Sequence, residues 1–172
     1  MKKESVRVLM VCHGNICRSP MCEFIFKDMV KKAHLEDAFY VESRATHTDE
    51  IWNGQGSPVY PPARDILAEH GISCTGKRAQ LLVKSEYDEY DYLVGMDEEN
   101  LRYMSRICGQ PGADREPLNR RGKKISLLMD YTDRPGSVAD PWYTRNFEVT
   151  YRDAVEGCKA LLDYIKEHDL NK

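Results

Sequence analysis

The stretch that decides the fold lies near the N-terminus, where a short apolar run leads into a turn that contains glycine. Residues 8–20 read Val8-Leu9-Met10-Val11-Cys12-His13-Gly14-Asn15-Ile16-Cys17-Arg18-Ser19-Pro20. The apolar run, taken from residue 7 to residue 12, predicts a buried β-strand. Pro20 suits the first position of a helix, and Ser19 is placed to cap it. A strand, a tight loop and a helix in this order predict the start of a βαβ unit.

The rest of the chain continues this alternation. Further strands are predicted at residues 39–43, 92–96 and 125–129, and further helices at 62–71, 98–107 and 147–165. Polar stretches rich in glycine and proline predict loops at 44–62, 109–122 and 131–143, and the acidic run 86–91 predicts a solvated loop. We therefore expect one α/β domain over residues 1–172, with a four-stranded parallel sheet and helices on both faces.

Two of these loops are expected to meet. In a doubly wound sheet, ligands bind at the carboxyl ends of the strands. The loop that begins with Cys12 and the loop that carries Asp140 both follow strands, so the same edge of the sheet should hold both.

The composition limits the setting and the partners of the protein. The chain has 172 residues, a net charge of -3 and six cysteines. Charges of both signs are interspersed, which predicts neither a nucleic-acid surface nor a membrane-binding helix. The first apolar run is too short for a signal peptide or a membrane span, so we expect a cytoplasmic protein with free thiols. The cysteines match no zinc spacing, and the five histidines form no spaced pair, which predicts surface or capping histidines and no metal site.

The chemistry is concentrated between Cys12 and Ser19. Backbone N–H groups of such a loop, together with a helix N-terminus, stabilise both a thiolate and an oxyanion. Arg18 would point at the centre of the loop, and its planar fork fits two oxygens of a phosphate group. A plain βα turn with a small buried cysteine is the simpler alternative, but it leaves the position of Arg18 unexplained. The residues therefore favour a nucleophile that handles phosphate groups.

These residues, with others along the chain, resemble the low-molecular-weight protein tyrosine phosphatases. The family's Cys-x-Gly-Asn-x-Cys-Arg-Ser-Pro loop is matched by Cys12, Gly14, Asn15, Cys17, Arg18, Ser19 and Pro20. Its later Asp-Pro pair followed by aromatic residues is matched by Asp140, Pro141, Trp142 and Tyr143. Similar landmarks between them are His70-Gly71-Ile72, Tyr90-Asp91-Tyr92, Met96-Asp97 and Asn100-Leu101. The resemblance covers essentially the whole chain and implies a flavodoxin-like fold of the phosphotyrosine phosphatase I type.

The resemblance implies a role for each motif residue. Cys12 is expected to be the nucleophile, Arg18 the clamp on two phosphoryl oxygens, and Ser19 a hydrogen-bond donor to the Cys12 sulfur. Asp140 is expected to protonate the departing phenolate and then to activate the water that hydrolyses the cysteinyl phosphate. The rest of the phosphate-binding loop would be His13, Gly14, Asn15, Ile16 and Cys17. Neither a metal ion nor another cofactor is required.

Aromatic residues are expected to form a slot for the phenyl ring of the substrate. Trp142 and Tyr143 follow closely after Asp140, where the family usually has two tyrosines. Trp52 either joins the rim of the pocket or is a surface or packing residue.

Three residues have further implied or alternative roles. By the resemblance, Asn15 stiffens the loop through hydrogen bonds, with Ser43 as one partner. Where many family members have a histidine after the Gly-Ile segment, this chain has Lys77. Cys17 is either a small buried side chain or the partner of Cys12 in a reversible, protective disulfide, and the resemblance favours the disulfide.

Other activities on the same fold compete with hydrolysis of phosphotyrosine. Arsenate reductases relay a disulfide through further cysteines, expected around residues 81–96, where this chain has none. Protein arginine phosphatases tend to have threonine at the position of Ile16, and an apolar residue there favours an aryl phosphate. A phosphotyrosine-binding module without activity would not need Cys12, Arg18 and Asp140 together.

We therefore rank protein tyrosine phosphatase first and protein arginine phosphatase second. The expected partner is a protein or peptide that contains phosphotyrosine. Phosphate and other oxyanions are expected to inhibit, and we expect a monomer.

Overall fold

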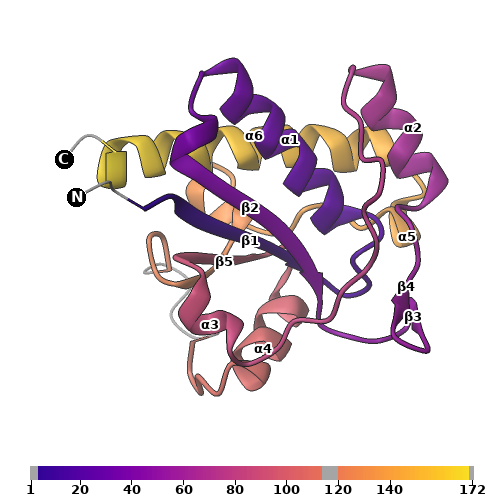
Figure 1. The fold of residues 1–172 in the computed structure, drawn as a ribbon, viewed down its shortest axis with the longest axis horizontal. Helices are drawn as coiled ribbons and strands as arrows, with labels where there is room; N and C mark the ends of the chain where they lie inside the picture. The colour runs from indigo at the N-terminus through magenta and orange to yellow at the C-terminus, as the bar shows by residue number, and fades with distance from the viewer. Residues whose placement is uncertain (1–3, 114–119, 171–172) are drawn as a thin grey trace.

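The centre of the molecule is a parallel sheet of four strands in the order β2-β1-β5-β6 (Figure 1). The computed structural model describes residues 4–113 and 120–170. The strands are β1 (Val6–Cys12), β2 (Phe39–Ala45), β5 (Tyr92–Gly95) and β6 (Ile125–Leu127). Among the described residues, no helix is long and apolar enough to cross a bilayer.

Helices cover both faces of this sheet (Figure 1). One face carries α1 (Arg18–Lys32), α2 (Pro61–Glu69) and α6 (Phe147–Ile165), and the other carries α3 (Glu86–Glu89) and α4 (Glu98–Ile107). Strand β1 shows why both layers form, because Val8 and Met10 belong to one hydrophobic core and Leu9 and Val11 to the other. A central strand buried on both faces has a continuous apolar sequence. The predicted fold class is confirmed.

The segment predicted as a loop at residues 44–62 is more ordered than expected. Strand β2 continues to Ala45, and β3 (Ile51–Trp52) pairs with β4 (Gln55–Gly56) as an antiparallel hairpin. Asn53 and Gly54 join them with positive φ angles of 50° and 76°. Asn-Gly favours this turn geometry, so the pair is the sequence signal for the hairpin.

The acidic run is not a solvated loop, because it begins with α3 and Glu86 is buried. The Glu86 carboxylate accepts a hydrogen bond from Arg44 Nε at 2.9 Å, and a buried charge is tolerated when it is paired in this way.

Other boundaries also differ from the predictions. Strand β6 ends at Leu127 and is followed by a 3-10 turn, η3 (Leu128–Tyr131), and the predicted loop at 131–143 ends in a short helix, α5 (Pro141–Thr144). A 3-10 turn, η1 (Glu36–Ala38), precedes β2, and a π-helical turn, η4 (Lys166–Leu170), follows α6. Residues 114–119 of the predicted loop at 109–122 lie outside the described residues.

The first helix begins earlier than the sequence predicts. Helix α1 starts at Arg18, and its N-cap residue is Cys17 without a side-chain cap. The prediction that Ser19 caps the helix is wrong, because its hydroxyl contacts the Cys12 sulfur at 2.9 Å instead. The loop closes so tightly over this sulfur that the first helical turn itself faces it.

Candidate active site

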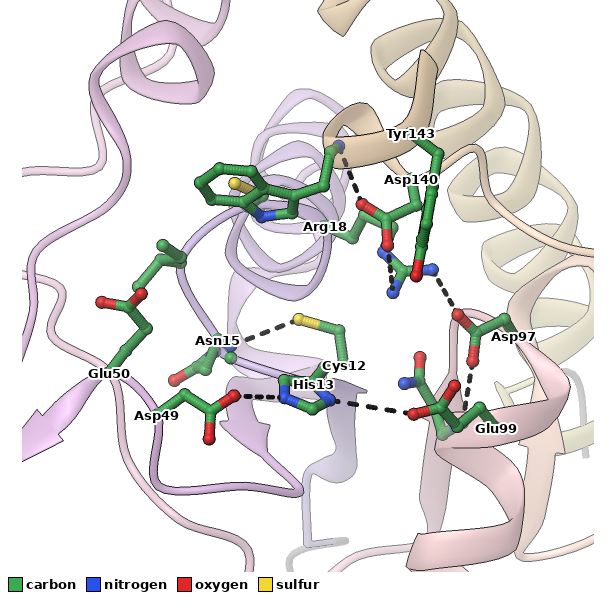
Figure 2. Close-up of a pocket in the computed structure, with 15 residues that line it drawn as sticks. Cys12, His13, Asn15, Arg18, Asp49, Glu50, Asp97, Glu99, Asp140 and Tyr143 are labelled. Carbon is green, nitrogen blue, oxygen red and sulfur yellow. Dashed lines mark hydrogen bonds and ion pairs between the residues drawn. The ribbon is translucent and has the colours of Figure 1, made fainter. Parts of the chain in front are cut away.

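A pocket of about 320 Å³ opens at the carboxyl edge of the sheet (Figure 2). It is lined by the loop residues 12–18, by Asp97 after β5, and by Asp140, Trp142 and Tyr143 around the start of α5. The fold thus brings together the two loops that the sequence places at this edge. Ser19 and Ser43 lie behind the lining, and Trp52 is outside it.

Hydrogen-bond donors surround the Cys12 sulfur. The backbone N–H groups of Asn15 and Ser19 donate to Sγ at 3.3 and 3.4 Å. Ser19 Oγ accepts a hydrogen bond from Asn15 Nδ2 at 2.8 Å and lies 2.9 Å from the sulfur, whereas the Arg44 carbonyl, the other acceptor for its proton, is 3.5 Å away. Such donors at the beginning of a helix stabilise negative charge on sulfur, which is what a thiolate nucleophile needs.

Asn15 holds this arrangement from behind. Its φ of 60° places the backbone in the left-handed region, and its side chain is buried. Oδ1 accepts from the backbone N–H of Gln80 at 3.0 Å, while Nδ2 donates to Ser19 and to Ser43, each at 2.8 Å. Both amide protons and the carbonyl are therefore used, which fixes the orientation of the side chain.

The network ends on a buried charge. Ser43 Oγ donates to Glu23 Oε1 at 2.6 Å, and the Glu23 carboxylate lies 3.2 Å from Lys77 Nζ and 2.6 Å from Lys27 Nζ. Burial lowers the pKa of Lys77, while the Glu23 carboxylate acts in the opposite direction. Lys77 also donates to the Ser43 carbonyl at 3.0 Å, so it belongs to the support of the loop.

Arg18 lies in the floor of the pocket and is 5% exposed. Its Nη1 is 2.7 Å from Asp97 Oδ2, and its Nη2 is 3.5 Å from Asp140 Oδ2. Burial alone would lower the pKa of this guanidinium, but Cys12 and the two carboxylates outweigh burial, and the pKa is raised. Arg18 is thus a fixed positive charge beside the Cys12 sulfur, suited to a phosphate group.

Asp140 has two structural roles at once. It is the N-cap of α5, where Oδ1 accepts from the Trp142 N–H at 3.0 Å, and its other oxygen faces Arg18. The cap role and the position at the pocket therefore hold together.

A match to known proteins decides the family. A family model described as "Low molecular weight phosphotyrosine protein phosphatase" matches residues 7–171. The chain belongs to this family. The resemblance seen in the sequence is therefore confirmed.

Individual relatives agree with this membership. "Low molecular weight protein-tyrosine-phosphatase YfkJ" of Bacillus subtilis is 34% identical, covering 94% of this chain and 97% of that protein. "Low molecular weight phosphotyrosine protein phosphatase" of Sus scrofa is 35% identical, covering 92% and 95%. The crystal structure of YfkJ has a TM-score of 0.86 at 32% identity, over 98% of this chain and 99% of that one. The crystal structure of DARP, a Drosophila arginine phosphatase, has a TM-score of 0.78 at 27% identity, over 94% and 99%.

Of the three aromatic residues predicted at the substrate slot, two line the pocket and one does not. Trp142 packs on Tyr60, with ring centroids 5.2 Å apart, and lines the pocket together with Tyr143. Tyr143 is 87% exposed, so its ring is available to a ligand. Trp52 is 75% exposed at the end of β3 and does not line the pocket, so the alternative of a surface tryptophan describes it.

Some residues of the pocket are not predicted by the sequence. Asp97 appears in the sequence only as part of a family landmark, and in the structure it caps α4 by accepting from the Asn100 N–H at 2.8 Å. Its second oxygen forms an ion pair with Arg18. The position of Asp97 directly after a predicted parallel strand is the sequence feature that could have placed it at the site. Asp49, Glu50 and Glu99 also line the pocket, and single polar residues in a loop or on a helix surface gave no comparable signal.

The histidines are more organised than the sequence predicts. The rings of His13 and His47 stack with centroids 4.0 Å apart, and His13 Nε2 lies 2.6 Å from Asp49 Oδ2. The backbone N–H of His47 donates to the His13 carbonyl at 3.1 Å, which brings the two residues together.

Cys17 belongs to the phosphate-binding loop and is buried, with 5% exposure. Burial, followed by the nearby Cys12 and Asp140, raises the pKa of its thiol to about 12. Cys17 is therefore a neutral thiol at neutral pH, in contrast to the role predicted for Cys12.

Proposed function

We propose that this phosphatase hydrolyses phosphotyrosine in proteins or peptides through a cysteinyl-phosphate intermediate on Cys12. The observation that carries the proposal is the convergence of the Cys12 sulfur, its three donors, Arg18 and Asp140 on one pocket. Each group has a partner that fixes its direction, which is the preorganisation that phosphoryl transfer requires.

In the first step, the phosphoryl oxygens take hydrogen bonds from the loop N–H groups and from Arg18. The Cys12 thiolate attacks phosphorus, the S–P bond forms, and the bond from phosphorus to the tyrosine oxygen breaks. Asp140 gives its proton to the departing phenolate.

In the second step, Asp140 takes a proton from a water molecule that attacks phosphorus. The S–P bond breaks, inorganic phosphate forms, and the Cys12 thiolate is restored. Ser19 assists as Cys12 leaves, because its hydroxyl lies 2.9 Å from the sulfur and its oxygen is already engaged by Asn15. The residues need no metal ion for either step.

Three residues support an aryl phosphate as the substrate. Trp142 and Tyr143 offer ring surfaces at the pocket, and Ile16 adds an apolar contact from the loop itself. Ile16 packs with Cys17 and Ala79 and is 6% exposed, so it stiffens the loop as well. Hydrolysis of phosphoarginine is the second candidate, supported by the likeness to DARP.

The test compares phosphotyrosine, phosphoarginine and phosphoserine peptides of one sequence, with a chelator present. We expect phosphotyrosine to be hydrolysed fastest, and we expect Cys12→Ser to reduce the rate on the order of 10⁴-fold or more, because the nucleophile is lost. Cys74→Ser is the matched control, since Cys74 is a buried thiol outside the pocket. Undiminished activity in Cys12→Ser would refute the mechanism. Faster hydrolysis of phosphoarginine than of phosphotyrosine would make arginine phosphatase the first candidate.

Further parts of the proposal concern the molecule as a whole. Inorganic phosphate and other oxyanions should inhibit by binding the same donors as the substrate. The chain is proposed to act as a monomeric single domain in the cytoplasm, and sedimentation analysis of the purified protein tests the monomer.

A further inference from the structure

The mouth of the pocket is lined by carboxylates. Asp49, Glu50 and Glu99 line it, in addition to the deeper carboxylates of Asp97 and Asp140. The deeper two lie 2.7 and 3.5 Å from Arg18, whose single positive charge offsets one of them. Within residues 4–113 and 120–170, the three at the mouth form no ion pair with lysine or arginine.

His13 lies between two of these carboxylates (Figure 2). Its Nε2 is 2.6 Å from Asp49 Oδ2, and its Nδ1 is 4.0 Å from Glu99 Oε1. The hydrogen bond from His13 lowers the pKa of Asp49, so this carboxyl is ionised at neutral pH. One imidazole carries at most one positive charge, and the mouth therefore stays negative whether or not His13 is protonated.

The imidazole is held in this place by a stack of rings. His13 packs on His47 at 4.0 Å, and His47 contacts the edge of Tyr103 at 4.4 Å. This stack joins the phosphate loop, the segment after β2 and helix α4. It keeps Asp49 and Glu99 on either side of His13, with side chains that are 63% and 59% exposed and can reach a partner.

Unbalanced carboxylates at the entrance repel a phosphate dianion, unless the substrate brings a positive charge of its own. We propose that the mouth recognises an arginine or lysine side chain next to the phosphotyrosine, with Asp49 and Glu99 as its main contacts. The inference rests on the proposed function, since it names the class of phosphotyrosine peptide that the site prefers. In Figure 2 these carboxylates lie across the pocket from Asp140 and Tyr143, so the phosphotyrosine ring and the flanking cation use different walls.

The experiment uses three phosphotyrosine peptides that differ only in the residues flanking the phosphotyrosine, which are arginine, alanine or glutamate. Each exposed ion pair should change kcat/KM by about two- to fivefold, so the order should be arginine, alanine, glutamate. The preference should shrink with added salt, because the Debye length falls from about 10 Å at 0.1 M to about 3 Å at 1 M.

Variants assign the preference to the mouth. The double variant Asp49→Asn with Glu99→Gln should bring the ratio of kcat/KM for the arginine and glutamate peptides close to one. Glu99→Lys should favour the glutamate peptide. The matched control is Asp163→Asn, which removes an exposed carboxylate near the end of α6 that lies away from α5 (Figure 1) and should keep the wild-type ratio.

Equal kcat/KM for the arginine and glutamate peptides in the wild type would overturn the inference. So would a ratio that the double variant leaves unchanged while its thermal unfolding matches that of the wild type. In both cases, hydrolysis of the alanine peptide still supports the proposed function. No hydrolysis of any of the three peptides would refute the proposed function itself.

Discussion

The floor of the pocket and its mouth differ in whether their polar side chains are buried and paired. On the floor, Asn15, Arg18 and Ser19 are buried, and each side chain is tied to a partner at 2.7–3.5 Å. At the mouth, Asp49 and Glu99 are exposed and lack a lysine or arginine partner among the described residues. A buried polar group left unpaired is costly, whereas an exposed charge is not. Changes to the floor should therefore affect turnover and stability together, and changes to the mouth should affect the choice of substrate.

After the loss of the Cys12 nucleophile itself, the largest effect is expected for Asp140→Asn, where floor and mouth meet. Turnover of phosphotyrosine should fall on the order of 10²- to 10³-fold, because asparagine cannot donate the proton to the phenolate. Asparagine also caps helices well, so α5 should remain in place. An aryl phosphate with a strongly acidic leaving phenol should lose far less activity in a steady-state assay. Equal losses on both substrates would mean that Asp140 is not the general acid.

Asn15→Gly should disturb the floor without touching the substrate. Glycine accepts the φ of 60° but removes three hydrogen bonds, so the free energy of unfolding should fall by about 2–4 kcal/mol. Turnover should fall roughly tenfold, since the orientation of Ser19 is lost.

Asn53→Gly is the matched control for this variant, because Asn53 has a φ of 50° in the exposed hairpin turn. Denaturant unfolding and initial rates should match the parent for this control. Loss of activity or stability at both asparagines would show that the backbone, not the amide network, causes the effect.

Cys17→Ser tests whether the second thiol of the floor protects the first. Peroxide converts the Cys12 thiolate to a sulfenic acid, and the Cys17 sulfur can then displace water to form a disulfide that thiols reduce. The variant should recover a severalfold smaller fraction of its own activity after peroxide and dithiothreitol. Recovery equal to that of the parent would remove the protective disulfide.

The raised pKa of Cys17, about 12, adds a pH dependence to this protection. The attacking group is the thiolate. At pH values below the pKa, the thiolate fraction grows about tenfold for each unit by which the pH is raised. Protection in the parent should therefore increase from neutral to alkaline pH. A recovered fraction that is independent of pH would show that attack by Cys17 does not limit the protection.

The smallest effect is expected for Tyr143→Ala at the mouth. Tyr143 is 87% exposed, so the free energy of unfolding should change by less than about 0.5 kcal/mol. Loss of a ring contact should lower kcat/KM for an aryl phosphate by about three- to tenfold. Tyr143→Phe keeps the ring and should behave like the parent. If it behaves like alanine, the hydroxyl and not the ring is what matters.

The sequence predicts those parts of the site that are contiguous or follow directly from strand ends. Cys12, Arg18 and Ser19 lie in one loop, and Asp140 follows from its place after the last strand together with the family motif. The pairing of Arg18 with Asp97 and of His13 with Asp49 joins segments far apart in the chain. Only the packed sheet fixes such distances, so spacing in the sequence cannot show them.

The same reasoning explains the errors in the fold. Glu86 looks like a solvent-facing residue in an acidic run, and its burial depends on Arg44 from a neighbouring strand. The Asn53-Gly54 pair by itself predicts a hairpin turn, but the polar composition of the surrounding segment predicts a loop. Trp52 lies at the end of β3 in this hairpin and is not among the residues that line the pocket.

Helix α5 has a consequence for how far this enzyme can be altered. Its N-cap residue is Asp140, and Trp142 and Tyr143 follow within the same turn, which ends at Arg145 with a left-handed φ of 54°. The proposed proton donor and the aromatic surfaces are therefore parts of one short segment. A substrate whose ring is misplaced against that segment also has its leaving oxygen misplaced from the acid. Selectivity for the substrate ring and proton transfer to its oxygen therefore depend on the same segment. Exchanging this segment between relatives should change both properties at once.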